Sequence, residues 1–241
     1  MFTEVLPHPA STIDDVVAMM TALEHALPPS DGVRWFNHLY LRVTLGVRAA
    51  IAGATAFNDP RFLDRLDVAF ANLYFDALCA NERDPESAPP AWRPLFSARS
   101  APRVLPLQFA LAGMDAHINR DLPAGLVTVF DELGGSPLDR GGRRDDFVRV
   151  NGILETVEAQ VKPEFATGPI GTLDRLTTPV DDRLAMWSVR AAREAAWTNA
   201  AVLWQLKAVP ALRQDFFDRL DRFTGFSAEA LLAVQSRASG G

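Results

Sequence analysis

The residues best suited to chemistry lie in one run, GMDAHINRDLP, from Gly113 to Pro123. His117 and Asp121 are four positions apart, so on a helix they stack on one edge of the apolar stripe. A carboxylate beside an imidazole fixes the tautomer of the imidazole and raises its basicity, which suits a general base or a metal ligand. Gly113 lies one turn before His117 and would let a helix or a substrate approach the ring closely.

An ordinary contact between His117 and Asp121 at the margin of the core is the alternative interpretation, and it would be worth only a few tenths of a kcal/mol. Asp115 and Asn119 are also four positions apart, but they stack on the opposite edge of the stripe. We therefore expect Asp115 and Asn119 to be structural and to share no ligand with His117.

Polar residues also fall at positions that helical periodicity assigns to the core in three other predicted helices. Asp67 and Tyr74 lie on the apolar face of one helix, Asn151 lies within the stripe of another, and His38 and Arg42 stack beside the stripe of a third. A buried polar group costs free energy unless it is partnered. These residues therefore either pair with one another as structure or converge on one cavity as a site.

A long helix predicted from Asp181 to Ala208 carries large rings and charges on one side, among them Trp187, Arg190 and Glu194. An arginine and a carboxylate beside aromatic rings could line a pocket and clamp an anionic or carbonyl group. A surface salt bridge that covers tryptophan edges is the alternative. An adjacent face of mostly small residues, such as Ala191, suits close packing against another helix.

Apolar residues recur mostly three and four positions apart and no stretch alternates with a period of two, so the sequence predicts an all-α, bundle-like domain. Seven or eight helices are expected, and Pro123 is expected to kink or divide the one from Leu107 to Leu133. Residues 81–106 and 134–146 are expected to be long surface connections. The 241 residues are expected to form a single domain.

The composition limits the kinds of partner that this protein is expected to have. Lys and Arg number 24 against 30 Asp and Glu, and no segment concentrates basic residues, so we expect no nucleic-acid partner. No apolar run is long enough to span a membrane and the first residues lack the pattern of a signal peptide, so we expect a cytoplasmic protein with no membrane partner. Cys79, the single cysteine, is expected to be an inert thiol. The oligomeric state cannot be read from the sequence.

Three segments of the chain resemble a family of uncharacterised proteins that is found widely in actinobacteria and in some fungi. The segments are GMDAHINRDLP, WFNHLYLRVT (Trp35 to Thr44) and FLDRLDVAFANLYFDAL (Phe62 to Leu78). The most specific motif of the family is AHINxDL, here Ala116 to Leu122, and the resemblance spans most of the chain. The family implies no settled reaction, but membership favours functional roles for His117 and Asp121.

The spacing of Gly113, His117 and Asp121 is also similar to the GxxxHxxxD arrangement of helical zinc phospholipase C and P1-type nucleases. That family needs several further histidines. The histidines of this chain are His8, His25, His38 and His117. A trinuclear zinc site is therefore excluded, whereas a single divalent metal ion held by His117, Asp121 and either His38 or Asp67 stays open.

These observations support three hypotheses. In the first, an enzyme acts on a small, largely apolar molecule in an interhelical cavity, with His117 as acid or base. In the second, a divalent metal ion is bound by His117, Asp121 and His38 or Asp67. In the third, a non-catalytic helical protein binds a ligand or a partner. Catalytic roles are expected for His117, Asp121, Asp67 and Asn151, and substrate-binding roles for Arg190, Glu194, Trp187, Tyr74 and Arg42.

Overall fold

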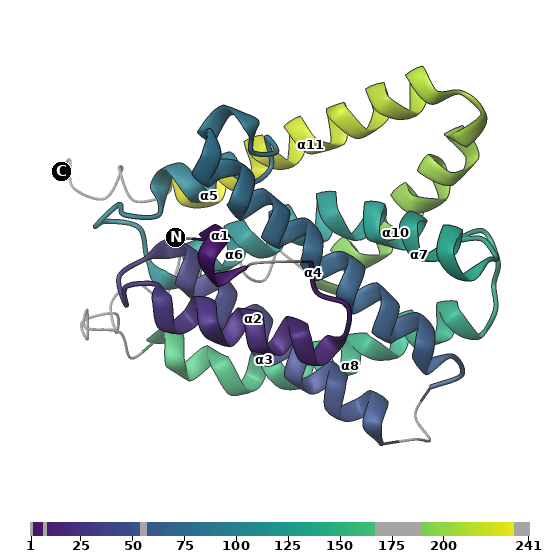
Figure 1. Ribbon diagram of the computed structural model, residues 1–241, viewed down its shortest axis with the longest axis horizontal. Helices are drawn as coiled ribbons and strands as arrows, with labels where there is room; N and C mark the ends of the chain where they lie inside the picture. The colour runs from purple at the N-terminus through teal and green to yellow at the C-terminus, as the bar shows by residue number, and fades with distance from the viewer. Residues whose placement is uncertain (1, 7–8, 54–56, 167–188, 234–241) are drawn as a thin grey trace.

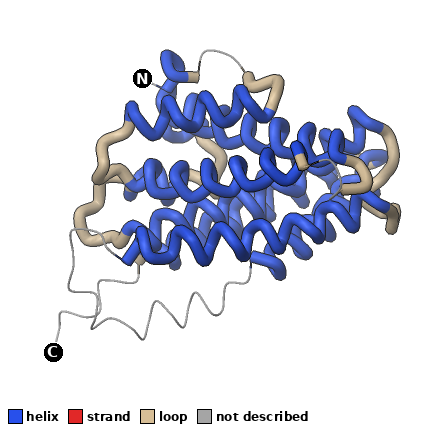
Figure 2. Tube along the Cα trace, turned by 90° about the horizontal axis from the view of Figure 1, so that it is seen from below, coloured by secondary structure: helices blue, strands red, loops and turns tan. Residues whose placement is uncertain are grey.

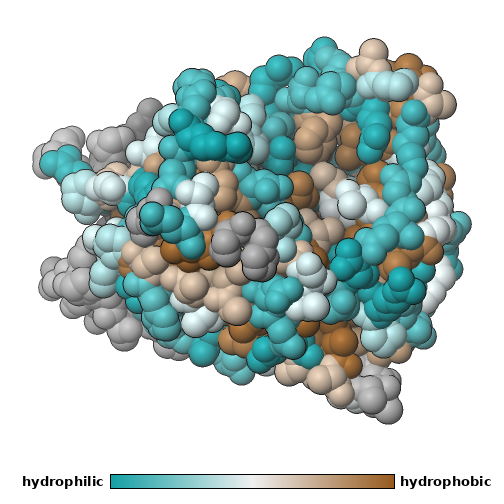
Figure 3. Space-filling view, viewed as in Figure 1, coloured by the Kyte–Doolittle hydropathy of each residue, from teal (hydrophilic) through white to brown (hydrophobic). Residues whose placement is uncertain are grey.

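The computed structural model describes residues 2–6, 9–53, 57–166 and 189–233. These residues form helices and short connections with no strand among them, which confirms the all-α fold (Figure 2). None of the helices in these ranges is both long and apolar enough to cross a membrane. Hydrophilic side chains cover much of the face in Figure 3, and apolar ones gather in smaller areas between them.

The described residues form a succession of helices. In chain order they are α1 (Phe2–Val5), α2 (Ile13–Ala26), α3 (Gly32–Ala52), α4 (Pro60–Arg83), the 3-10 turn η1 (Pro85–Ser87), α5 (Arg93–Ala98), α6 (Pro106–Ala116), the π-helical turn η2 (His117–Asp121), α7 (Leu122–Leu133), α8 (Gly142–Ala166), α10 (Val189–Gln205), the 3-10 turn η4 (Leu206–Ala208) and α11 (Pro210–Leu232).

The centre of the molecule is the rod formed by α6, η2 and α7. α6 packs against α3 and α11, while α7 packs against α4 and α10, and α8 packs against α3. Figure 1 shows α11 crossing the side of the molecule opposite to α2, α3 and α8. Every residue of α6 from Gln108 to Ala116 is buried, so the run that carries His117 lies inside the core rather than at its margin.

Three of the described helices, α2, α3 and α4, begin at residues whose side chains accept from the free backbone N–H groups of the first turn. Thr12 and Asp15 form a capping box before α2, and Asp31 accepts from the backbone of Val33 at the start of α3. Asp59 caps α4, and Pro60 follows it at the first helical position. An aspartate followed by proline is a helix start that the sequence itself signals.

Two glycines bring α3 and α6 unusually close together. A Cβ atom at Gly113 would lie 2.3 Å from Cγ of Phe36, and one at Gly32 would lie 2.4 Å from Cδ1 of Phe109. Each helix therefore seats a phenylalanine ring of the other against a glycine. The close approach expected at Gly113 is made by a helix, and it brings α3 beside His117.

Several predicted boundaries are wrong. α8 begins at Gly142, inside the connection predicted for residues 134–146. The predicted connection at 81–106 contains the end of α4, η1 and α5. The face of small residues on α10 is not a packing face, because Ala191 and Ala195 are exposed. Residues 181–188 of the long helix predicted from Asp181 to Ala208 lie outside the described residues.

Candidate functional site

The central rod is interrupted at η2, one turn before the kink that Pro123 predicts. The backbone N–H of Leu122 donates to the carbonyl of His117, five residues earlier, which makes this turn π-helical. Proline has no N–H, and its ring conflicts with the carbonyl four residues before it. A widened turn relieves that conflict. π-turns inside α-helices occur often at functional sites, and this one contains both His117 and Asp121.

The predicted contact between His117 and Asp121 is present, and it is fully buried. Nδ1 of His117 lies 3.0 Å from Oδ2 of Asp121, and the two side chains are 1% and 0% exposed. Trp92 donates its indole N–H to the same oxygen at 3.0 Å, and Arg120 donates to the other oxygen at 2.6 Å. Carboxylate oxygens accept hydrogen bonds, so Nδ1 carries the proton and Nε2 holds the lone pair.

Nε2 of His117 is buried and has no hydrogen-bond partner among the described residues. The ring stacks on Phe70 with centroids 3.4 Å apart, and the Tyr40 ring lies 4.4 Å away. Burial lowers the pKa of His117 below its usual 6.5, although the hydrogen bond and charge of Asp121 act in the opposite direction. The imidazole is therefore neutral at pH 7, with an unpaired base nitrogen.

A second buried carboxylate fixes the residues around Asp121. Asp221 on α11 accepts from Nε of Arg120 at 3.2 Å and from the backbone N–H of Ala91 at 2.7 Å. Arg120 thus bridges two carboxylates, Asp121 and Asp221. The His117 ring is oriented by a network that joins η2, α11 and the segment before α5, and such connected networks hold side chains rigidly.

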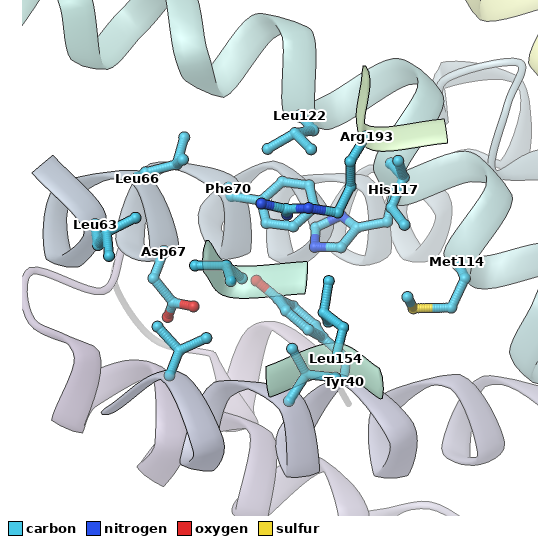
Figure 4. A pocket seen from close by; sticks show the side chains of 14 residues that line it. Tyr40, Leu63, Leu66, Asp67, Phe70, Met114, His117, Leu122, Leu154 and Arg193 are labelled. Atoms are coloured by element: carbon cyan, nitrogen blue, oxygen red, sulfur yellow. The ribbon is translucent and has the colours of Figure 1, made fainter. Parts of the chain in front are cut away.

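His117 lines a cavity of about 50 Å³ between helices. Its walls come from α3, α4, η2, α8, α10 and the ends of α6 and α7, and most of the lining side chains are aliphatic, such as Val150 and Leu154. The polar groups on its wall are those of Tyr40, Asp67, His117 and Arg193. Figure 4 shows these four side chains directed toward one region from four different elements.

Asp67 on α4 supplies an acid to this cavity. The residue is 8% exposed, and its Oδ2 atom has no hydrogen-bond partner among the described residues. Burial raises the pKa of Asp67 to about 8, and the charge of Asp64 adds to this effect. Burial also raises the pKa of Tyr40 well above its usual value, with the charges of Asp67 and Asp121 contributing. Both groups therefore carry a proton at pH 7.

Arg193 on α10 supplies a cation, and Asn151 helps to hold it. Nε of Arg193 donates to Oδ1 of Asn151 at 2.8 Å, and Nη2 donates to the carbonyl of Phe147 at 2.7 Å. The guanidinium group lies 4.0 Å from the centre of the Phe147 ring. Burial lowers the pKa of Arg193 to about 9, and the charge of Arg144 acts in the same direction, so the group is still charged at pH 7.

The structure thus brings several predicted site residues together. His117 and Asp67 line the cavity, Asp121 orients His117, and Asn151 acts through Arg193. Tyr74 lies behind the cavity wall, with its ring 4.9 Å from Phe36 and 6.1 Å from His117. Tyr74 is not among the residues that line the cavity, so its substrate-binding role stays a prediction.

Three other predicted substrate-binding residues lie away from the cavity. Arg42 pairs with Glu164 at 3.3 Å, and the exposed Arg190 pairs with Glu155 at 2.6 Å. Glu194 pairs with Arg144. α10 turns its Arg193, Ala196 and Ala200 face inward, so Arg190 and Glu194 point outward. Trp187 lies outside the described residues.

The predicted metal site is not assembled. His38 makes hydrogen bonds of 2.7 Å to both Glu24 and Glu164 instead of joining His117. Among the described residues, no group of three or more His, Cys, Asp or Glu could hold a metal ion. The oxygens of Asp121 are also occupied by its three donors, so the donor set does not fit the divalent ion considered from the sequence.

Tyr40, Phe70, Trp92 and Arg193 belong to the site but were missed by the sequence analysis. The sequence did contain a signal for Arg193, because it shares the helical spacing of Ala196 and Ala200. An arginine is seldom buried unless it is paired, so an arginine on an apolar helical face indicates a specific role. No comparable signal singles out Trp92, because it lies outside any long periodic helix.

Fold and site together define an all-α protein with a histidine–aspartate pair at a π-turn, facing an interhelical cavity. The chain belongs to the family of unknown function DUF5995, which matches residues 13–234. This range includes η2 and every polar residue of the cavity wall. Comparison with curated proteins and with solved structures gives no match.

Proposed function

We propose that this protein is an enzyme of acid–base chemistry that acts on a small molecule, with His117 as the general base. The observation that carries the proposal is the state of the imidazole. Its Nδ1 is fixed by Asp121, while its Nε2 is buried, unpaired and on the wall of a cavity. A buried polar atom without a partner costs free energy, so a group of the substrate that pairs with Nε2 would remove that cost.

Asp67 is the matching acid of the proposal. At one pH the base must be free of its proton while the acid still carries one. Burial produces both states here, because it lowers the pKa of His117 and raises the pKa of Asp67. The neutral imidazole accepts a proton from the substrate at Nε2, and Asp121 stabilises the resulting imidazolium ion. Protonated Asp67 returns a proton to another atom of the substrate. Asp121 and its partner Trp92 act as positioning residues.

The size of the cavity limits what reacts there. A volume of about 50 Å³ has room for about four water molecules, since each needs about 10–15 Å³ by this measure. The reacting part of the substrate therefore has only a few non-hydrogen atoms, and its surroundings are largely apolar. This agrees with the small, largely apolar substrate expected from the sequence.

A non-catalytic ligand-binding protein is the second candidate. It is favoured by the burial of His117, which is only 1% exposed. In that case the unpaired groups would hold a ligand permanently rather than turn it over.

The proposal is tested by incubating the purified protein with a bacterial small-molecule extract and following the compounds by mass spectrometry. We expect the wild-type protein to convert at least one small compound, and His117→Gln to reduce that conversion by about 100-fold or more, as is typical for loss of a general base. The matched control is His25→Gln at an exposed position of α2, which should react like wild type.

Conversion that is equal in the His117→Gln and wild-type proteins would overturn the assignment of His117. A compound that co-purifies with the wild-type protein and is lost from His117→Gln, without conversion in either protein, would establish the ligand-binding alternative instead.

A further inference from the structure

The cation in the cavity has no carboxylate hydrogen-bonded to it among the described residues. The hydrogen-bond acceptors of Arg193 are the amide oxygen of Asn151 and the backbone carbonyl of Phe147, and both are neutral. Glu194, the neighbouring carboxylate, is paired with Arg144. Buried charges are normally paired, because an unpaired charge costs several kcal/mol to remove from water.

The geometry of Arg193 leaves one edge of its guanidinium group free. Nε and Nη2 are engaged, whereas Nη1 makes no hydrogen bond to the described residues, and the residue lines the cavity while being only 7% exposed. The two fixed hydrogen bonds and the contact with the Phe147 ring prevent the group from turning toward solvent. The free edge is thus held at the cavity by its own anchors.

The other polar groups of the cavity do not neutralise this cation. Asp67 is the carboxyl group on the cavity wall, and it is protonated at pH 7 because burial raises its pKa to about 8. Protonated Asp67 and the phenol of Tyr40 can donate hydrogen bonds to an oxygen atom. The cavity therefore combines a fixed cation and two O–H donors with an aliphatic wall.

We propose that the cavity binds a small carboxylate with a short aliphatic chain, whose anionic group pairs with Arg193. A guanidinium group offers parallel donors that match the two oxygens of a carboxylate, and the valine and leucine side chains of the wall suit the carbon chain. This proposal names the substrate class for the proposed function and rests on it for the reaction, but the binding step can be tested separately.

The test uses acetate and propionate as ligands, with acetamide and propionamide as uncharged counterparts of the same shape, and isothermal titration calorimetry at pH 7. We expect saturable binding of both acids and at least tenfold weaker binding of the amides. Propionate should bind about fourfold more tightly than acetate, because one buried methylene contributes about this factor.

Arg193→Gln should weaken propionate binding by at least tenfold, and Arg193→Lys should restore part of it. The matched control is Arg190→Gln on the exposed face of the same helix, which should bind like wild type. If Arg193→Gln does not fold, the comparison of acids with amides on the wild-type protein still decides the question.

Equal binding of propionate and propionamide, or binding unchanged in Arg193→Gln, would refute the carboxylate site. Phosphate that binds as tightly as propionate would also overturn it, because the aliphatic wall would then contribute nothing. His117→Gln separates the two proposals. If it binds propionate normally and the extract assay finds no conversion dependent on His117, the carboxylate site stands and the acid–base function fails.

Discussion

Single residues decide how closely the helices surround the His117 ring. Gly113 lies one turn before His117, and the Phe36 ring occupies the space where a side chain at position 113 would lie. Phe36 in turn has its ring 5.6 Å from that of His117. A glycine inside a helix costs about 0.5–1 kcal/mol relative to alanine, so its presence here is explained by packing.

Gly113→Ala should therefore lower the free energy of unfolding by about 1–3 kcal/mol, because the new methyl group forces the Phe36 ring to move. Gly152→Ala on α8 is the matched control. Its new Cβ atom meets nothing within 4 Å, so it should raise stability by about 0.5–1 kcal/mol. Urea denaturation of the two variants measures both effects. Equal changes in the two proteins would contradict the packing role of Gly113.

At the scale of the elements, α11 holds the π-turn in place from outside. Asp221 reaches from α11 to Arg120 of η2 and to the backbone of Ala91. The helix can approach this closely because it carries Gly225, where a Cβ atom would lie 2.8 Å from the carbonyl oxygen of Pro90. Asp221 and Gly225, one turn apart on α11, thus connect the segment before α5 with the turn that carries His117 and Asp121.

Asp221→Asn should lower stability by about 1–3 kcal/mol, because it leaves the partly buried Arg120 with one carboxylate in place of two. Hydrogen exchange should also become faster in η2 and in residues 89–92. Asp218→Asn, a surface position that accepts a hydrogen bond from Gln214, should change stability by no more than about 0.5 kcal/mol. Unchanged exchange in η2 would show that α11 does not hold this turn.

The burial of the polar residues on the cavity wall is a property of the whole molecule. α3, α4, α8 and α10 come from separate parts of the chain, and their assembly around the central rod removes Asp67, His117 and Arg193 from water. The shifted pKa values of these residues follow from that removal from water, since burial is the largest cause in each case.

Asp67 should make stability depend on pH in a definite direction. Its pKa is about 8 in the folded protein and about 3.9 in an unfolded chain. Between these values the folded state holds a proton that the unfolded state has lost, so stability falls as the pH rises, by up to about 1.4 kcal/mol per unit. Asp67→Asn should remove this slope, and the exposed Glu229→Gln should retain it.

Urea denaturation at pH 5, 6, 7 and 8 measures the slopes. Because His117 is present in all three proteins, its own contribution cancels from their differences. If the slope of Asp67→Asn equals that of wild type, the Asp67 carboxyl group is not the buried acid inferred from the structure.

The sequence alone determined the features that depend on neighbours along the chain. Helical spacing identified the all-α fold, and the pairing of His117 with Asp121 needed only one turn of helix. The cap at Asp59 and the close approach at Gly113 were also local. The outer residues of α10 were misjudged, because spacing defines a helical face without saying which face turns inward.

Only the tertiary structure decided which of these residues share a cavity. Arg193 lies 76 positions from His117 along the chain and Asp67 lies 50 positions from it, and no local pattern relates such distant residues. Burial decides the protonation states of the site, because desolvation keeps Asp67 protonated and His117 neutral. The run from Gly113 to Pro123 carries the pair, but the surrounding helices give it an acid, a cation and a cavity.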